Sequence, residues 1–233
     1  MSNFFETKRY LLKRKTAWTI VCYILLLVSL SLLCACKTKT DYFHYVSELR
    51  SNIFIAKTED LSLRIYAVEK ENPYLSDGIK QETTKRTEIY LIAPEGNKEY
   101  NISFTLGENT YGGDMSFDNV KTEYYYACTL DIASEKSIPC KITCGDTIVE
   151  MNAESVKTET TLSAKYVLEN LVTEETALFN AMTDKYGFIG EIYLRLIYED
   201  APYYYIGVID RNGGINAFLI NAQTGKILAK RKS

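Results

Sequence analysis

The sequence predicts a mainly β fold with an α+β part: an N-terminal antiparallel β-sandwich-like domain, followed by a C-terminal helix packed on a three- to four-stranded antiparallel sheet. Apolar and polar residues alternate in short runs from Leu61 to about Ala153, which is typical of half-buried strands. After residue 162 the apolar residues recur at helical spacing, and strand-like alternation returns at Glu191. A helix followed by an antiparallel meander predicts one sheet face covered by one helix.

The first part of this fold is expected over residues 42–153. Its first apolar residues, Tyr42, Val46, Leu49 and Ile53, fall at helical spacing and predict a short helix at the start. Roughly seven short strands follow, as in a small sandwich. Turn residues separate them at positions 76–78, 94–97, 111–114, 134–136 and 145–146.

The second part is expected over residues 163–233, after a polar linker at 154–162. Ser163 is the candidate N-cap of a helix of about twenty residues that ends at Thr183, before Gly187. Strands are predicted at residues 191–198, 203–210, 215–222 and 226–230, with an Asn-Gly turn between the second and the third.

The composition excludes several classes of function. The 233 residues are 46% hydrophobic and 24% charged, which is enough apolar surface for a real core. A formal net charge of −3 gives no electrostatic reason to expect nucleic acid. His44 is the single histidine, so a His-based metal cluster and most catalytic triads are excluded, and it receives no role. We expect no metal, no cofactor and no nucleic-acid partner.

The N-terminus has the pattern of an exported protein. Five basic residues precede twenty uncharged ones at positions 17–36, a run long enough to cross a bilayer as a helix. The run ends in the sequence LCAC at positions 33–36, which resembles the bacterial lipobox. The resemblance implies that residues 1–35 are a cleaved signal peptide and that Cys36 carries a lipid on the outer side of the cytoplasmic membrane of a bacterium.

An uncleaved anchor helix is the alternative interpretation of the same run, and it would suit a structural subunit of a membrane complex. In both cases the basic leader keeps the N-terminus in the cytoplasm and the rest of the chain outside. Residues 36–41 then form a short polar tether. We therefore expect the membrane as a partner through this anchor.

Three cysteines remain in the exported part: Cys128, Cys140 and Cys144. On a strand, Cys140 and Cys144 would lie about 13 Å apart, too far to bridge each other. One disulfide from Cys128 to either of them and three reduced thiols are both compatible with the sequence.

A family resemblance is carried by residues 203–228 (YYYIGVIDRNGGINAFLINAQTGKIL), which resemble the end of a PepSY domain. Asp210 and Gly213 match its D-x-x-G turn, and residues 221–228 match its second turn and strand, with Asn221 where the family usually has aspartate. The resemblance covers about 70 residues. It implies a binding or regulatory role toward a secreted or membrane peptidase, and it supplies no catalytic residues.

Tyrosine is the compositional excess, with nineteen residues and two triplets. In a strand, the central residue of a triplet points opposite to its neighbours, so one or two rings of each triplet should meet solvent. Exposed tyrosines bind partners at little entropic cost, although ordinary cross-strand packing is the alternative. The candidate partner-binding residues are Tyr124, Tyr126, Tyr203, Tyr204 and Tyr205, and Tyr204→Ala is expected to weaken partner binding more than folding.

Catalysis has one candidate site, the 111–118 loop, in which Asp114 and Asp118 would form the carboxylate pair of a hydrolase. Carboxylates of this kind are also typical of an exposed loop. The sequence therefore favours a non-catalytic binding or regulatory lipoprotein of the bacterial envelope, with an envelope protein or peptide as its partner. The hydrolase and the structural subunit remain alternatives.

Overall fold

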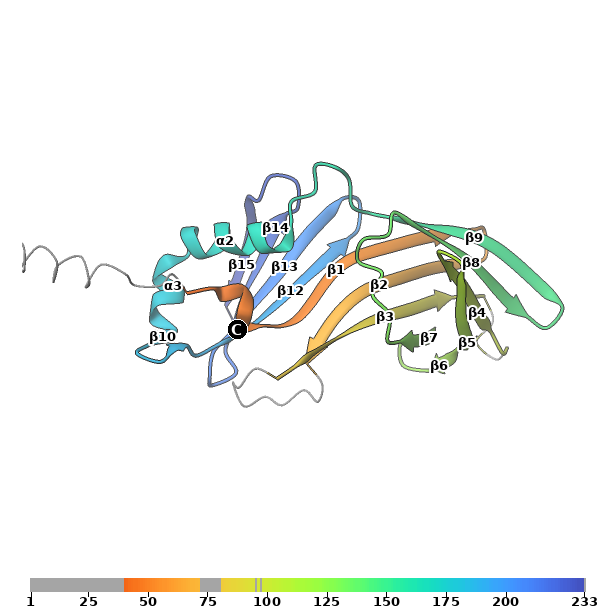
Figure 1. Ribbon diagram of the computed structural model, residues 1–233, viewed down its shortest axis with the longest axis horizontal. Helices are drawn as coiled ribbons and strands as arrows, with labels where there is room; N and C mark the ends of the chain where they lie inside the picture. The colour runs from red at the N-terminus through yellow and green to blue at the C-terminus, as the bar shows by residue number, and fades with distance from the viewer. Residues whose placement is uncertain (1–39, 72–80, 95, 97, 233) are drawn as a thin grey trace, which may run out of the picture. The chain divides into compact units, whose positions relative to one another are not determined.

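The computed structural model describes residues 40–71, 81–94, 96 and 98–232, and the chain divides into the units Met1–Thr40 and Asp41–Ser233. The described helices and strands all belong to the second unit (Figure 1). The predicted signal peptide and Cys36 lie outside the described residues.

Strand is the dominant structure of the second unit. The unit opens with the 3-10 helix η1 (Tyr42–Tyr45), and two α-helices, α2 (Ala164–Glu174) and α3 (Thr176–Ala181), come much later in the chain. Ser163 caps α2 as predicted, because its side chain accepts a hydrogen bond from the Tyr166 amide at 3.3 Å. The strands are β1 (Val46–Lys57), β2 (Ser62–Glu71), β3 (Thr83–Ile92), β4 (Asn101–Leu106), β5 (Asn109–Asp114), β6 (Ser116–Asp118), β7 (Glu123–Cys128), β8 (Ser137–Cys144), β9 (Thr147–Ser155), β10 (Thr183–Asp184), β11 (Gly187–Phe188), β12 (Glu191–Tyr198), β13 (Pro202–Ile209), β14 (Ile215–Asn221) and β15 (Ile227–Lys232).

Among the described residues, thirteen strands form one sheet, and β10 pairs with β11 separately. The main path of the sheet has the order β15-β14-β13-β12-β1-β2-β3-β7-β6. A branch leaves this path at β1, where β9 pairs with β1, β8 with β9, β4 with β8 and β5 with β4. The pairing of β1 with β12 is parallel, and the others in the sheet are antiparallel.

The predicted fold class, a sandwich-like domain followed by a helix on a sheet of its own, is wrong. The four strands β12 to β15 do not form a separate sheet. β12 also pairs with β1, in the register Val46↔Ile192 to Arg50↔Arg195, and this pairing joins the four strands to the rest of the sheet. The predicted helix of about twenty residues is two shorter helices, and Glu175 lies between them. Periodicity reports which face of an element is buried and not which strand it pairs with, so the sequence did not reveal this continuous sheet.

The predicted helix at the start of the second unit is also wrong, because only η1 is helical and the residues from Val46 onward form β1. Register shifts mark β-bulges between Val46 and Glu48 and between Arg50 and Asn52. The first bulge puts Val46 and Leu49 on the same face although they are three residues apart. The bulged strand therefore imitates a helical spacing.

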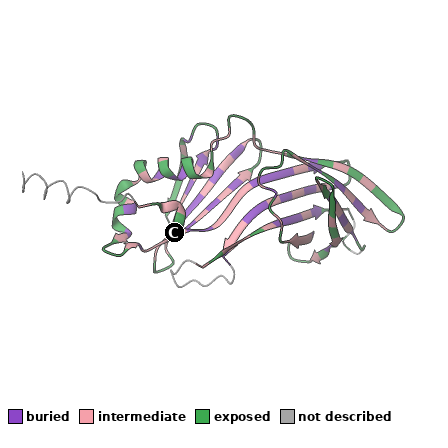
Figure 2. Ribbon diagram, viewed as in Figure 1, coloured by how far each residue is buried: buried purple, intermediate pink, exposed green. Residues whose placement is uncertain are grey.

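Two buried clusters fill the unit (Figure 2). The first core lies among β2, β3, β7, β4, β8, β9 and the second half of β1. The second core lies between the helices α2 and α3 and the strands β12, β13 and β14, with Val46, Leu49 and Ile53 of β1. Neighbouring residues of β1, Ile53 and Phe54, are 3% and 0% exposed and belong to different cores. β1 therefore connects the two cores.

The two turns that resemble PepSY are held by local hydrogen bonds. Oδ1 of Asp210 accepts from the amides of Asn212 at 2.8 Å and Gly214 at 2.9 Å. Oδ1 of Asn221 accepts from the amides of Gln223 and Thr224, each at 2.9 Å, so asparagine performs the acceptor role of the usual aspartate.

Alternate residues of β12, β1, β2, β3 and β7 point away from the core that their own strand helps to form, although Tyr66 also packs against the second core. Arg50 lies opposite Arg195 on β12 and Val68 on β2, and Tyr90 lies opposite Tyr125. Most of these side chains are half-exposed. We call this side of the sheet the open face, and its residues include Glu48, Arg50, Arg64, Tyr66, Lys70, Glu88, Tyr90, Tyr125, Tyr193, Arg195 and Tyr205.

Candidate functional site

Three tyrosine rings cross the open face from β2 to β7, and we call them the tyrosine ladder: Tyr66, Tyr90 and Tyr125. The ring centroids of Tyr66 and Tyr90 are 5.4 Å apart, and those of Tyr90 and Tyr125 are 5.0 Å apart. The Arg50 guanidinium lies 4.1 Å from the centre of the Tyr66 ring, and Nζ of Lys121 lies 5.5 Å from that of Tyr90. The ladder is therefore an aromatic surface that already attracts cations.

Strand register explains the ladder. Tyr90 and Tyr125 are direct cross-strand partners, whereas Tyr66 is opposite Glu88 and reaches Tyr90 diagonally. Direct and diagonal aromatic pairs of this kind contribute about 0.2–1 kcal/mol each to stability. The rings are thus held on strands of a continuous sheet rather than on loops.

The carboxylates beneath the ladder are paired. Glu88 is 5% exposed and accepts from Nζ of Lys70 at 2.8 Å and from the Tyr90 hydroxyl at 3.3 Å. Glu123 is 7% exposed and accepts from Arg64 at 2.9 Å. These partners offset the cost of burying charge, so both carboxylates are part of the support of the ladder.

The ladder hydroxyls stay neutral. Burial, followed by the charge of Glu88, raises the pKa of Tyr90 well above its usual range. The same two causes raise the pKa of Tyr125. Both hydroxyls therefore remain protonated over the physiological range, and the Tyr90 proton is the one donated to Glu88.

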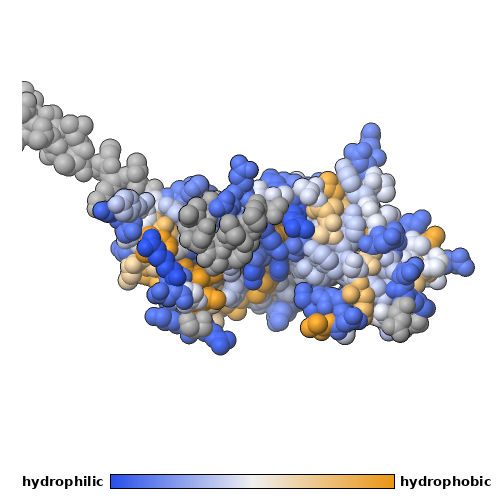
Figure 3. All heavy atoms as spheres, turned by 90° about the horizontal axis from the view of Figure 1, so that it is seen from below, coloured by the Kyte–Doolittle hydropathy of each residue, from blue (hydrophilic) through white to orange (hydrophobic). Residues whose placement is uncertain are grey.

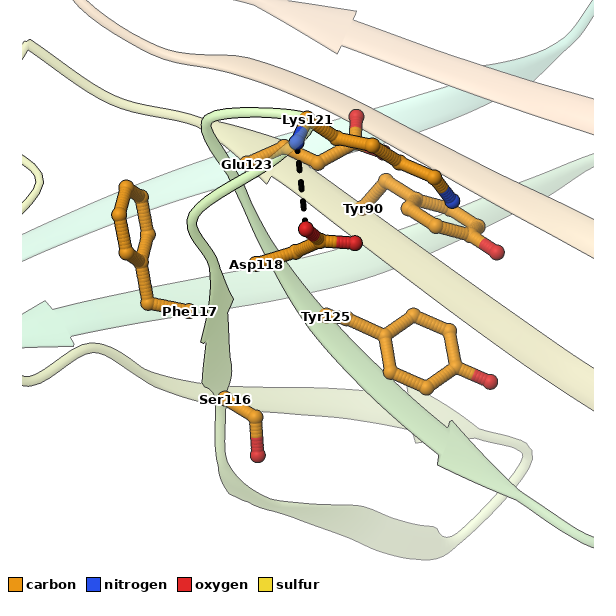
Figure 4. Close-up of a pocket in the computed structure, with 7 residues that line it drawn as sticks. All are labelled: Tyr90, Ser116, Phe117, Asp118, Lys121, Glu123 and Tyr125. Atoms are coloured by element: carbon orange, nitrogen blue, oxygen red, sulfur yellow. Dashed lines mark hydrogen bonds between the residues drawn. The ribbon is translucent and has the colours of Figure 1, made fainter.

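A hollow of about 250 Å³ lies beside the ladder. Figure 4 shows Asp118, Tyr90 and Tyr125 on the same side of β6, with Phe117 on the other side. The backbone amides of Val120 and Lys121 donate to Oδ1 of Asp118 at 2.9 and 3.1 Å, and they lower the pKa of this carboxyl. The hollow is lined by Tyr90, Ser116, Phe117, Asp118, Lys121, Glu123 and Tyr125.

Two arginines of the open face keep an unused donor. The Nε atoms of Arg50 and Arg64 are buried and have no hydrogen-bond partner among the described residues. By contrast, Arg195 is satisfied by Glu48, whose two carboxylate oxygens accept at 2.8 and 2.5 Å. Buried donors without a partner are uncommon in folded proteins.

The predicted tyrosines separate into different environments. Tyr124 is 2% exposed and Tyr204 is 0% exposed, in the first and second core. Their hydroxyls each donate at 2.8 Å, to the carbonyls of Lys98 and Leu162. A partner that meets the folded protein does not reach these two rings.

The other three predicted tyrosines are half-exposed. Tyr126 packs against the first core and donates to the Gly112 carbonyl at 3.1 Å, and Tyr203 donates to Asp200 at 3.0 Å. Tyr205 lies on the open face, where its register partner on β12 is Arg195. The binding role of these three residues stays a prediction.

Sequence reasoning missed Tyr125, the central residue of its triplet. Alternation shows that Tyr125 and its neighbours face opposite sides, but it does not show which side is covered. The signal that would have helped is Glu123, two residues earlier, because a carboxylate on the same face as Tyr125 is more typical of the side away from an apolar core.

The acidic residues proposed for a hydrolase are not in one loop. Asp114 ends β5, where it is exposed and accepts from Asn101 at 3.0 Å, and Asp118 ends β6. The hollow beside the ladder is lined by Asp118 and Glu123, and Asp114 is not among its lining residues. Backbone hydrogen bonds lower the pKa of Asp118, and Glu123 is ion-paired with Arg64.

Other reactive groups do not gather into a site within the described part of the chain. There, no group of three or more His, Cys, Asp and Glu residues is arranged to hold a metal ion. His44 is exposed beside Tyr45. Cys128, Cys140 and Cys144 are free thiols, and burial raises the pKa of Cys140 to about 12.

Comparison with known proteins identifies no relative. No family model, curated protein or solved structure matches the chain. Within the described residues, the helices are too short or too polar to span a bilayer. The resemblances to a lipobox and to PepSY therefore stay predictions from the sequence.

Proposed function

We propose that this protein is a non-catalytic binding or regulatory module of the bacterial envelope, tethered to the membrane through Cys36, that recognises another envelope component with its open face. The observation that carries the proposal is the tyrosine ladder with the Arg50 and Lys121 cations against it. The lipobox-like sequence supports the location, and the PepSY-like sequence makes a peptidase one class of partner.

The ladder suits recognition because its rings are large, amphipathic and already held in place. A tyrosine side chain has little rotamer entropy to lose, so a partner gains contact area at low cost. The half-exposed rings lie beside the Arg50 and Lys121 cations, which supply polar contacts next to apolar ones. This combination is typical of a binding surface with energetic anchors.

The polarity of the surface agrees with a reversible partner. The side of the molecule in Figure 3 shows apolar residues in separate patches among hydrophilic ones. Non-obligate interfaces have this mixed character, whereas permanent ones are more apolar.

Site-specific photocrosslinking in intact cells tests the proposal. The full-length chain is produced with a photoreactive phenylalanine analogue in place of Tyr125, and a matched chain carries it in place of Tyr166, which is 49% exposed on α2. We expect a defined adduct from position 125 and none from position 166. Equal labelling from both positions, or none from position 125, would contradict the assignment of the open face.

A further inference from the structure

The hollow beside the ladder has an aromatic wall. Tyr125 lies opposite Ser116 in the register of β6 and β7, and its ring packs at 5.0 Å from that of Tyr90. Both rings are half-exposed, and their hydroxyls stay neutral for the reasons given above. The electron-rich face of a neutral aromatic ring attracts polarised C–H groups, such as those on one face of a pyranose.

Polar groups surround this wall at the positions that a polyhydroxylated ring needs. Ser116 is exposed and offers a hydroxyl, and Lys121 offers an ammonium from the turn after β6. Asp118 is ionised, and its hydrogen bonds to described residues all use Oδ1. Its Oδ2 can therefore accept from ligand hydroxyls, while the turn amides keep the carboxylate in place.

The charge and size of the hollow limit the class of ligand. The charges of Lys121 and Asp118 balance, and Arg64 balances Glu123 at 2.9 Å. This balance gives no preference for a strongly charged ligand. A volume of about 250 Å³ is just below the range of about 300–1,000 Å³ that drug-sized ligands occupy, so it suits a single small ring.

From these observations we infer that the hollow lined by Tyr90, Tyr125, Ser116 and Asp118 binds one ring of a neutral saccharide. The ring stacks on Tyr125, and its hydroxyls donate to Asp118 and accept from Lys121. The inference rests on the proposed function and names the chemistry of the component that is recognised. A glycan of the envelope and a free sugar both have this chemistry.

Saturation-transfer NMR on the full-length chain tests the inference. The chain is held in a detergent without a sugar headgroup, since such a headgroup would compete for the hollow. The probes are N-acetyl-D-glucosamine and the methyl glycosides of D-glucose, D-galactose and D-mannose, with D-glucuronate and D-glucosamine as charged comparisons. We expect millimolar binding of at least one neutral probe, and weaker binding of both charged ones.

Three variants and a control locate the binding. Tyr125→Ala is expected to weaken the best neutral probe by about tenfold or more, Asp118→Asn by about threefold or more, and Tyr125→Phe by less than about threefold, because the ring is kept. Tyr166→Ala, on the exposed side of α2, should bind like the unchanged chain. Circular dichroism of each variant verifies that it is folded.

The source of the saccharide is distinguished by the linear trisaccharide of the best probe. Tighter binding of the trisaccharide than of the monosaccharide assigns the ligand to a glycan chain, and equal affinity assigns it to a free sugar; both support the inference. No binding of any neutral probe up to roughly 50 mM, or binding that Tyr125→Ala and Asp118→Asn leave unchanged, overturns it. Failure here together with a position-125 crosslink overturns the saccharide alone and leaves the proposed function standing.

Discussion

At the scale of the residue, Tyr204 shows how burial separates a structural tyrosine from a binding one. Its ring has no exposed surface, and its hydroxyl satisfies the Leu162 carbonyl at the start of the helical segment. Tyr125, on the open face, has the same residue type and a similar sequence setting, with a tyrosine on each side. The difference lies only in which side of the strand is covered.

We therefore predict that Tyr204→Ala lowers the free energy of unfolding by about 3–5 kcal/mol, because it removes a buried aromatic ring. Tyr204→Phe should cost about 1–3 kcal/mol, because the Leu162 carbonyl loses its donor. Urea unfolding measures both. Tyr203→Phe, whose hydroxyl meets Asp200 at the surface, is the control and should leave the midpoint unchanged. A Tyr204→Phe protein as stable as the unchanged one would contradict this role.

Cys140 makes stability depend on alkaline pH. Its pKa is raised by burial from 9.0 to about 12, so the folded state keeps the thiol protonated while the unfolded state releases the proton. Between about pH 9 and 12 the unfolded state therefore binds fewer protons, and stability should fall with pH by up to about 1.4 kcal/mol per unit for this group. Unfolding of Cys140→Ala over the same range should show a shallower fall; an unchanged slope would exclude Cys140 as a cause.

At the scale of the element, β1 shows how a bulged strand can resemble a helix in sequence. Its bulges shift the alternation, and its two halves pair with different strands, β12 at Val46–Arg50 and β9 at Phe54–Ile55. Each half consequently takes its burial pattern from different neighbours. No single period describes such a strand.

Gly112 lies on β5 where the backbone of β4 approaches closely. Gly112 has a φ of 150°, and a Cβ atom there would lie 1.9 Å from the Ile102 carbonyl oxygen. We expect Gly112→Ala to destabilise the protein by at least about 2 kcal/mol more than Gly107→Ala, since both positions have a positive φ but only Gly112→Ala adds a clash with the Ile102 backbone. At Gly107, φ is 59° and a Cβ atom would meet nothing within 4 Å. Gly107→Ala therefore measures the cost of the positive φ alone, without a steric clash. Thermal unfolding of the two variants measures this difference. An equal loss of stability in Gly112→Ala and Gly107→Ala would contradict the prediction.

At the scale of the whole molecule, the parallel pairing of β1 with β12 joins segments that are more than 140 residues apart in the chain. The adjacent residues Ile53 and Phe54 of β1 belong to the second and the first core, respectively. The bidentate pair of Arg195 with Glu48 also joins β12 to β1. Because one strand serves both cores, we expect the described unit to unfold as one.

Substitutions in the two cores test this cooperativity. Ile142→Ala in the first core and Ile206→Ala in the second should each cost about 2–5 kcal/mol and move a single common transition. Tyrosine fluorescence and far-UV circular dichroism should give the same midpoint. Two separate transitions, each moved by only one of the variants, would show that the cores fold independently.

The sequence alone determined the local features of this protein. Ser163 as a cap, the turns at Asp210 and Asn221, and the strand Glu191–Tyr198 were all predictable, because their hydrogen bonds or periodicity involve residues close together in the chain. Only the tertiary structure decided that β1 is a strand, that β12 continues the first sheet, and that Tyr125 rather than Tyr124 lines the hollow. These outcomes depend on which distant segment covers each face, and local propensity carries no information about that choice.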